Sequence, residues 1–322
     1  KNKIAQLIVS AREINKFHGT FLSSIMKYQV NGRIHGEINQ LRGDNGGTVS
    51  GRLSMSNPNL QQVPARNKDF GPKIRSLFIP EEGFKWGSFD YSQQEPRMTV
   101  HYAASIGEGY EGSNELVQAY QNSEADFHQT VADLVGIERT QAKTIGLGLM
   151  YGMGKNKLAI SLGVSKDEAD ELIIKYNKKV PFVKKLSDRC KFAADEKGVI
   201  RTKKGRKCRF DMWETRDFGL HIAEKYEDAV AKYGKNNIKR AYTYKALNRL
   251  IQGSSADQTK QSMLDCFNEG HLPMLQIHDE LCFNVKDEKH AKEIQKIMQN
   301  AIKFKVPSVV DFGLGKSWGD AK

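Results

Sequence analysis

The stretch Phe89-Asp90-Tyr91-Ser92-Gln93-Gln94-Glu95 closes an apolar run that begins at Gly83. The run contains several aromatic residues and starts at a glycine, so it predicts a strand that carries Asp90 at its end. A carboxylate in this position would be held on a rigid edge. Asp90 is therefore a candidate catalytic residue.

A second acidic stretch, Gln276-Ile277-His278-Asp279-Glu280, lies far along the chain. Two apolar-rich runs, 272–277 and 281–285, flank its polar residues. This pattern predicts a β-hairpin that presents Asp279 at its tip.

Asp90 and Asp279 would form a site of high negative charge if the fold brings them together. Two carboxylates ~4 Å apart repel each other by roughly 4 kcal/mol at an effective dielectric of about 20. Such a pair makes sense with cations between its members, and its hard oxygen ligands suit Mg²⁺. The pair predicts metal-assisted phosphoryl transfer.

A predicted helix between the two stretches carries Arg139, Lys143, Leu147 and Tyr151 at four-residue spacing. Residues four apart lie on one face of a helix. The two cations on this face can hold the phosphates of an incoming substrate.

Six blocks, in this order along nearly the whole chain, resemble those of the DNA polymerase I family, DNA polymerase family A. The stretch from Asp90 to Arg97 resembles motif A, the stretch from Arg139 to Gly152 resembles motif B, and His278-Asp279-Glu280 resembles motif C. Further matches are Ser50-Gly51-Arg52-Leu53-Ser54 with Asn57-Pro58-Asn59-Leu60-Gln61, Asp126-Phe127-His128, and Asn248 with Gln252-Gly253 and Ala256-Asp257.

The resemblance implies a role for each matched residue. Asp90, Asp279 and the backbone carbonyl of Tyr91 would bind two Mg²⁺ ions, which Mn²⁺ can replace, and Glu280 would support them. The implied nucleotide-binding residues are Gln93, Glu95, His128, Arg139, Lys143, Leu147 and Tyr151.

Within that set, His128, Arg139 and Lys143 match triphosphate-binding positions, and Lys143 is also the candidate proton donor to pyrophosphate. Glu95 matches the acid that blocks a ribose 2′-hydroxyl. Tyr151 resembles the aromatic residue that occupies the templating position.

Four further residues match positions that touch the minor groove or the primer terminus, where contacts need not read sequence. They are Arg52, Asn248, Gln252 and His278. The chain also departs from the family pattern, with Leu147 where many members have an aromatic residue and Gln94 and Pro96 where motif A usually has aliphatic ones. These departures are more similar to phage-type members.

The fold class implied by the resemblance is α+β, a right-hand polymerase with an antiparallel palm sheet, helical fingers and a truncated thumb. We expect the base of the thumb at 1–30, the palm at 31–112 and 246–322, and the fingers at 113–245. Apolar periodicity predicts helices over 3–28 and about 287–303, the latter with Asp287 as N-cap. The segment 44–47 has turn chemistry.

Composition sets the broad class of the protein. The 322 residues are 39% hydrophobic and have a formal net charge of +12, which excludes a disordered chain and favours a polyanionic partner. Four scattered cysteines suggest neither a zinc site nor a disulfide framework. With no apolar run of ~20 residues, we expect no membrane association and a cytoplasmic location, in a bacterium, an infected host or an organelle.

The expected activity is template-directed DNA synthesis, with primer–template DNA and deoxynucleoside triphosphates as partners. Proofreading is not expected in this chain, which looks like a fragment or processed product, and a processivity, helicase or primase partner cannot be identified. Two alternatives stay open: a single-subunit RNA polymerase, against which Glu95 argues, and a catalytically inactive nucleic-acid-binding module.

Overall fold

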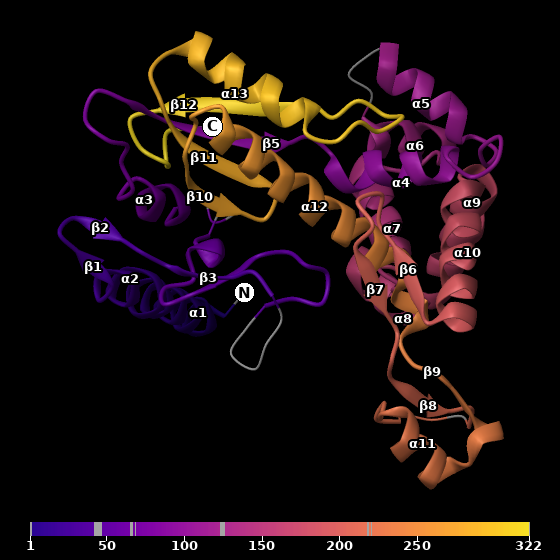
Figure 1. The fold of residues 1–322 in the computed structure, drawn as a ribbon. Coiled ribbons are helices and arrows are strands. Elements are labelled where there is room, and N and C mark those ends of the chain that lie inside the picture. Colours follow the sequence, from indigo (N-terminus) through magenta and orange to yellow (C-terminus); the bar gives the residue numbers. More distant parts are fainter. Residues whose placement is uncertain are drawn as a thin grey trace. The chain divides into compact units, whose positions relative to one another are not determined.

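The computed structural model describes residues 2–41, 47–64, 67, 69–122, 126–217, 219 and 221–321. The chain divides into two compact units, whose elements are labelled in Figure 1. Unit 1 consists of Lys1–Ser92, Gln258–Ile302 and Val309–Lys322, and unit 2 of Gln93–Asp257 and Lys303–Ser308.

Unit 1 contains one four-stranded sheet and several short helices and hairpins. Its elements are α1 (Lys3–Lys16), the π-helix η1 (Phe17–Ser23), α2 (Ser24–Met26), β1 (Gln29–Val30), β2 (Arg33–Ile34), β3 (Glu37–Asn39), β4 (Ser54–Ser56), the 3-10 helix η2 (Leu60–Gln62), α3 (Gly71–Arg75), β5 (Lys85–Tyr91), β10 (Pro273–Ile277), β11 (Glu280–Val285), α13 (Glu288–Asn300) and β12 (Val310–Gly315).

The sheet of unit 1 has the strand order β10-β11-β5-β12, and all neighbouring strands are antiparallel. Side chains of β5 alternate between its two faces, so Phe89 and Tyr91 lie in one apolar cluster and Trp86 in another. The sheet is therefore buried on both faces, and its inner strand β5 is held by partners on either side.

The helix α13 covers one face of this sheet (Figure 1). The side chain of Asp287 accepts a hydrogen bond from the backbone N–H of His290, which confirms the predicted N-cap. Ala291, Ile294 and Met298 are fully buried in the cluster that includes Phe89. The helix ends at Asn300, three residues before the predicted end.

The predicted N-terminal helix is helical from Lys3 to Met26, but in three pieces of which η1 is a π-helix. Phe17, Phe21 and Ile25 are buried, whereas α1 has no buried residue. Of the apolar residues predicted to share one face of this helix, only those from Phe17 onward therefore pack into the apolar core of unit 1. The predicted turn at 44–47 lies mostly outside the described residues.

Unit 2 is mainly helical. Its elements are α4 (Gln94–Ala104), α5 (Ser113–Asn122), α6 (Phe127–Val135), α7 (Arg139–Met150), α8 (Lys155–Leu162), α9 (Lys166–Lys179), α10 (Pro181–Lys197), β6 (Val199–Arg201), β7 (Lys207–Arg209), β8 (Trp213–Thr215), α11 (Tyr226–Tyr233), the 3-10 helix η3 (Lys235–Asn237), β9 (Ile238–Arg240) and the 3-10 helix η4 (Thr243–Lys245). The long helix α12 (Ala246–Asn268) begins in unit 2 and ends in unit 1.

Two antiparallel pairs interrupt the helices of unit 2, in the segment 113–245 where helical fingers were expected. The strands β6 and β7 pair with Ile200 opposite Cys208, and both side chains are buried in the main apolar cluster of the unit. The strands β8 and β9 pair in the same way and contact α11. These strands are three residues long, too short to show a clear period in the sequence.

The α+β prediction is confirmed. The two compact units do not follow the predicted subdomain boundaries, since α4 belongs to unit 2, and the division into thumb, palm and fingers stays a prediction. No helix in the described part of the chain is long and apolar enough to cross a membrane. All four cysteines are buried free thiols.

Candidate functional site

A group of carboxylates gathers at one end of the unit 1 sheet. Asp90 on β5 pairs with Glu280 on β11 and with Asp311 on β12, so the three residues share a row across the strands. Asp279 precedes Glu280 in the two-residue tip of the β10–β11 hairpin. The tip turns sharply because His278 has a left-handed backbone conformation with φ of 55°.

These neighbours change the acidity of Asp90. Surrounding protein that displaces water, followed by the charges of Asp279, Glu280 and Asp311, raises the pKa of Asp90 to about 7 from an ordinary 3.8. The side chain itself remains accessible to solvent. A cation beside these carboxylates would relieve their repulsion, and it would compete with a proton for Asp90.

The raised pKa leads to a prediction about stability in the absence of divalent cations. Between pH 4 and 7 the folded protein holds a proton on Asp90 that the unfolded chain has lost, so stability falls as pH rises through this window. We expect Asp90→Asn to raise Tm at pH 8, by about 1–3 °C because solvent screens the repulsion at this accessible site. The difference should shrink toward pH 4. A Tm difference that does not change with pH would contradict the shifted pKa.

Buried neighbours orient the other residues of the hairpin. The indole Nε1–H of Trp318 donates to Oε1 of Glu280 over 3.2 Å, and the guanidinium of Arg75 lies 4.3 Å from the Trp318 ring. Within the hairpin, Gln276 accepts a 2.8 Å hydrogen bond from Nε2 of Gln61. The hydrogen bond from Trp318 thus fixes the Glu280 carboxylate, which suits the supporting role predicted for Glu280.

The donor set fits a magnesium site that is completed by a substrate. Mg²⁺ is commonly bound through one or two carboxylates, with water and substrate phosphates as its other ligands. In the described part of the chain, no three His, Cys, Asp or Glu side chains form a ready-made metal cluster. Asp90 and Asp279 could supply carboxylate oxygens, while the Tyr91 side chain is turned away and donates from its hydroxyl to the Met298 carbonyl.

In unit 2, α7 presents the predicted row of side chains. Arg139 is paired with Asp126, whose Oδ2 accepts hydrogen bonds from Nε at 2.8 Å and Nη2 at 2.5 Å. The other oxygen of Asp126 caps α6 by accepting from the backbone N–H groups of His128 and Gln129. Asp126 therefore fixes both the start of α6 and the Arg139 guanidinium.

His128 and Lys143 lie near this ion pair and differ in environment. Burial, together with the positive charges of Lys143 and Arg139, lowers the pKa of His128 to about 4 against the opposing effect of Asp126. The buried Nδ1 atom of His128 has no hydrogen-bond partner among the described residues. Lys143 is exposed and has no carboxylate partner in the same part of the chain. Lys143 is thus a cation that a ligand can reach, whereas His128 is enclosed by protein.

Glu95 and Tyr151 are joined directly, since the Tyr151 hydroxyl donates a hydrogen bond to Oε2 of Glu95. Gln93, which has a left-handed backbone with φ of 51°, uses its side-chain oxygen to accept from the backbone N–H of Phe127 at 2.9 Å. The first turn of α4 is in this way tied to α6 and to the end of α7. Leu147 is half-buried against the apolar core of unit 2.

The four predicted DNA-binding residues fall in both units. Arg52 and His278 belong to unit 1, where Arg52 is half-buried and His278 exposed. Asn248 and Gln252 lie one turn apart on α12 in unit 2, and both are half-buried. The predicted catalytic and nucleotide-binding residues form two groups, the carboxylates of unit 1 and the α4–α6–α7 group of unit 2.

The sequence alone did not identify Asp311 as a site residue. It also did not indicate that Asp126 pairs with Arg139 or that Trp318 holds Glu280. Asp311 is one of several acidic residues outside the matched blocks, and only the pairing of β12 with β5 places it beside Asp90. Asp126 stood in a matched block, and its position just before an apolar run is a recognisable N-cap signal.

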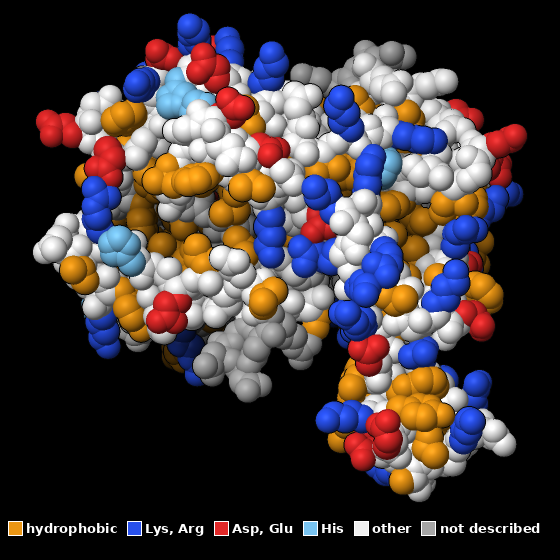
Figure 2. Space-filling model, in the orientation of Figure 1, with side chains coloured by type: hydrophobic (Ala, Val, Ile, Leu, Met, Phe, Trp, Pro, Cys, Tyr) orange, Lys and Arg blue, Asp and Glu red, His pale blue; other side chains and the backbone are white. Residues whose placement is uncertain are grey.

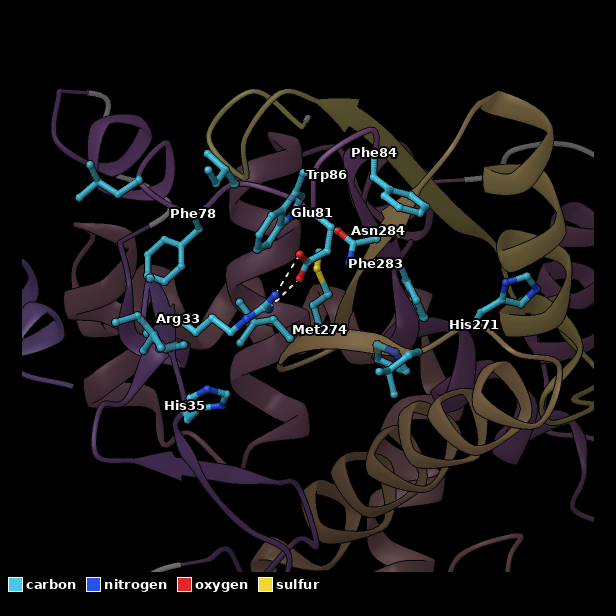
Figure 3. A pocket seen from close by; sticks show the side chains of 18 of the residues that line it. Arg33, His35, Phe78, Glu81, Phe84, Trp86, His271, Met274, Phe283 and Asn284 are labelled. Carbon is cyan, nitrogen blue, oxygen red and sulfur yellow. Dashed lines mark hydrogen bonds and ion pairs between the residues drawn. The ribbon is translucent and has the colours of Figure 1, made fainter. Parts of the chain in front are cut away.

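A large pocket of about 1020 Å³ in unit 1 lies apart from these residues. Figure 3 shows its lining, in which the carboxylate of Glu81 faces the guanidinium of Arg33. None of the predicted site residues lines it.

Comparisons with known proteins bear on the whole chain. The model of the family described as DNA polymerase family A matches residues 1–320. A "DNA-directed DNA polymerase" of Pseudomonas phage M6 is 39% identical over 98% of this chain and 51% of its own length. A "DNA polymerase I" of Geobacillus stearothermophilus is 30% identical over 100% of this chain and 35% of its own length.

A solved structure is similar as well. It is described as the POL domain of Pol1 from M. smegmatis in complex with DNA primer-template and dNTP. It has 27% sequence identity and a TM-score of 0.78, and the match covers 98% of this chain and 53% of that one. The chain thus spans about half the length, or less, of the curated relatives that it matches.

Proposed function

Since the chain belongs to DNA polymerase family A, we propose that it catalyses template-directed DNA synthesis, adding deoxynucleotides to the 3′-hydroxyl of a primer. The observation that carries the proposal is the carboxylate group around Asp90. Burial, followed by the charges of Asp279, Glu280 and Asp311, raises the pKa of Asp90 to about 7 there. Such crowding is typical of a site built to attract cations.

Asp90 and Asp279 are the residues that would hold magnesium, with the backbone carbonyl of Tyr91 as a further ligand. When bound, Mg²⁺ supplies Lewis-acid activation of the primer hydroxyl and neutralises charge on the leaving pyrophosphate. Glu280, fixed by Trp318, keeps the field at this sheet end negative.

The predicted triphosphate-binding residues of unit 2 would bind the nucleotide. Lys143 is free to contact the triphosphate and to pass a proton to the leaving pyrophosphate. Arg139 keeps its Nη1 group outside the pair with Asp126, so it can bind a phosphate without leaving that partner. The buried side chain of His128, whose pKa is lowered to about 4, would add no positive charge at pH 7.

Sugar selection would depend on Glu95, which the Tyr151 hydroxyl holds in place. We expect Glu95→Ala to raise the kcat/KM for a ribonucleotide relative to the matching deoxynucleotide by about 10- to 100-fold, because the space for a 2′-hydroxyl opens. Tyr151→Phe keeps the ring and loses only the hydrogen bond, so its shift should be smaller and in the same direction. Single-nucleotide kinetics measure the ratio. If the ratio stays at the wild-type value in Glu95→Ala, Glu95 does not select the sugar.

Arg52, His278, Asn248 and Gln252 would contact the primer–template without reading its sequence. All four side chains are polar and reach solvent, at least in part. An enzyme that copies any template needs contacts of this kind.

Primer extension in Mg²⁺, with deoxynucleotides and ribonucleotides in parallel, tests the proposal. A DNA polymerase extends the primer mainly with deoxynucleotides. Preferred use of ribonucleotides would indicate the RNA polymerase alternative. DNA binding without any extension would indicate an inactive binding module.

A further inference from the structure

The β6–β7 hairpin of unit 2 presents a row of cations that the proposed catalytic roles do not use. Its strands pair with Arg201 opposite Lys207 and Val199 opposite Arg209. Since alternate residues of a strand share a face, Arg201, Lys207 and Arg209 lie on one side, and all three are exposed. The opposite side is buried through Ile200 and Cys208. Figure 2 shows blue side chains gathered over these two strands.

The cations of this face lack acidic partners. Among the residues that the structure describes, Arg201, Lys207 and Arg209 form no ion pair with a carboxylate. Arg201 donates only to the backbone carbonyl of Gly205, at 3.3 Å. Like charges directly opposite each other on paired strands are destabilising. The pair of Arg201 and Lys207 is therefore unfavourable for the fold unless an anion binds there.

Buried contacts hold the hairpin rigidly. In the turn, Arg206 pairs with the buried carboxylate of Asp257 on α12 at 2.6 Å, and the Thr202 hydroxyl donates to its other oxygen at 2.6 Å. The backbone N–H of Lys203 donates to the Tyr102 hydroxyl of α4. These contacts use Arg206 for structure and leave the strand cations facing solvent at fixed positions.

Positive charge also surrounds the tip of the hairpin. Lys203 donates to the backbone carbonyl of Lys303 and lies 5.5 Å from the Phe304 ring. Burial, followed by the charges of Lys203 and Lys305, lowers the pKa of His101 to about 4. Two separate segments of unit 2 thus place the cations Lys203 and Lys305 near His101.

We propose that the exposed face of the β6–β7 hairpin binds backbone phosphates of DNA through Arg201, Lys207 and Arg209. The inference deepens the proposed function and rests on it, because it assigns a further contact surface for the same nucleic acid. The spacing of the cations along two strands suits successive phosphates and reads no bases. Both the unpaired template strand and the duplex offer this chemistry.

The test measures the Kd for primer–template DNA at 50 to 200 mM salt, without nucleotides, for Arg201→Gln/Lys207→Gln. Two lost phosphate contacts should reduce the slope of log Kd against log salt by about 1.8 for duplex or about 1.4 for single strand. Across this salt range, the affinity of the variant should therefore fall about 10-fold less than that of wild type. Blunt duplex and duplex with a long 5′ template overhang separate the two sources.

Matched variants exclude a general charge effect. Lys178→Gln/Lys179→Gln removes two exposed cations from the end of α9 and should keep the wild-type slope. The exchange Arg201→Lys/Lys207→Arg keeps both charges and should also bind as wild type. Removal of the opposed cations should leave Tm unchanged or raise it. Equal slopes for the hairpin and α9 variants would overturn the proposal.

The result is independent of catalysis. If wild type extends primers and the hairpin variant binds like the α9 variant, only this inference fails. If wild type binds DNA through the hairpin but extends no primer, the proposed function fails and the phosphate-binding surface stands.

Discussion

Replacement of Asp90 by asparagine is expected to reduce primer extension by at least about 10³-fold, since a lost cation ligand removes several kcal/mol of transition-state stabilisation. Asp279→Asn should behave in the same way. The Kd for primer–template DNA should stay close to that of wild type, because cations elsewhere supply that affinity. Single-turnover extension and DNA-binding titrations measure the two quantities separately.

Asp311→Asn is the matched control, because it makes the same change one strand away from Asp90. It should lower the pKa of Asp90 and retain extension within about 10-fold of wild type. A second readout is the rise in Tm on addition of Mg²⁺, which Asp90→Asn should abolish and Asp311→Asn should preserve. Near wild-type extension by Asp90→Asn would remove Asp90 from the catalytic role.

Lys143→Gln is expected to lower kcat by about 10²- to 10⁴-fold, as loss of a positioned proton donor does in other enzymes. The exposed Lys143 ammonium has no carboxylate partner among the described residues, so the change should leave Tm nearly unchanged. Lys157→Gln, which removes an exposed cation from α8, is the control and should keep the wild-type kcat. Equal kcat values for the two variants would mean that Lys143 is an ordinary surface lysine of α7 without a role in catalysis.

The central elements of the site could be predicted from local sequence. The apolar run before Asp90 and the two runs around Asp279 are long enough to fix β5, β10 and β11. The four-residue spacing from Arg139 to Tyr151 likewise marks one face of α7. Short-range patterns determine these elements, and the structure has them within a few residues of the expected ends.

Features that depend on distant pairing could not be predicted. Asp311 reaches the carboxylate group only through the register of β12 against β5, about 220 residues apart in the chain. The pairing of Arg139 with Asp126 depends on how α6 packs against α7. The hairpin of β6 and β7 is too short for its period to be read, and distant residues hold it, through the contacts of Asp257 and the burial of Ile200 and Cys208.

The account is tested most directly by a single-nucleotide extension assay on four primer–templates that differ only in the templating base. We predict that, in Mg²⁺, each primer grows by one residue with the complementary deoxynucleotide and that one pyrophosphate is released per residue added. Asp90→Asn should bind the same DNA and release none. Extension that ignores the templating base, or no extension by the wild-type protein on any of the four, would contradict the proposed function.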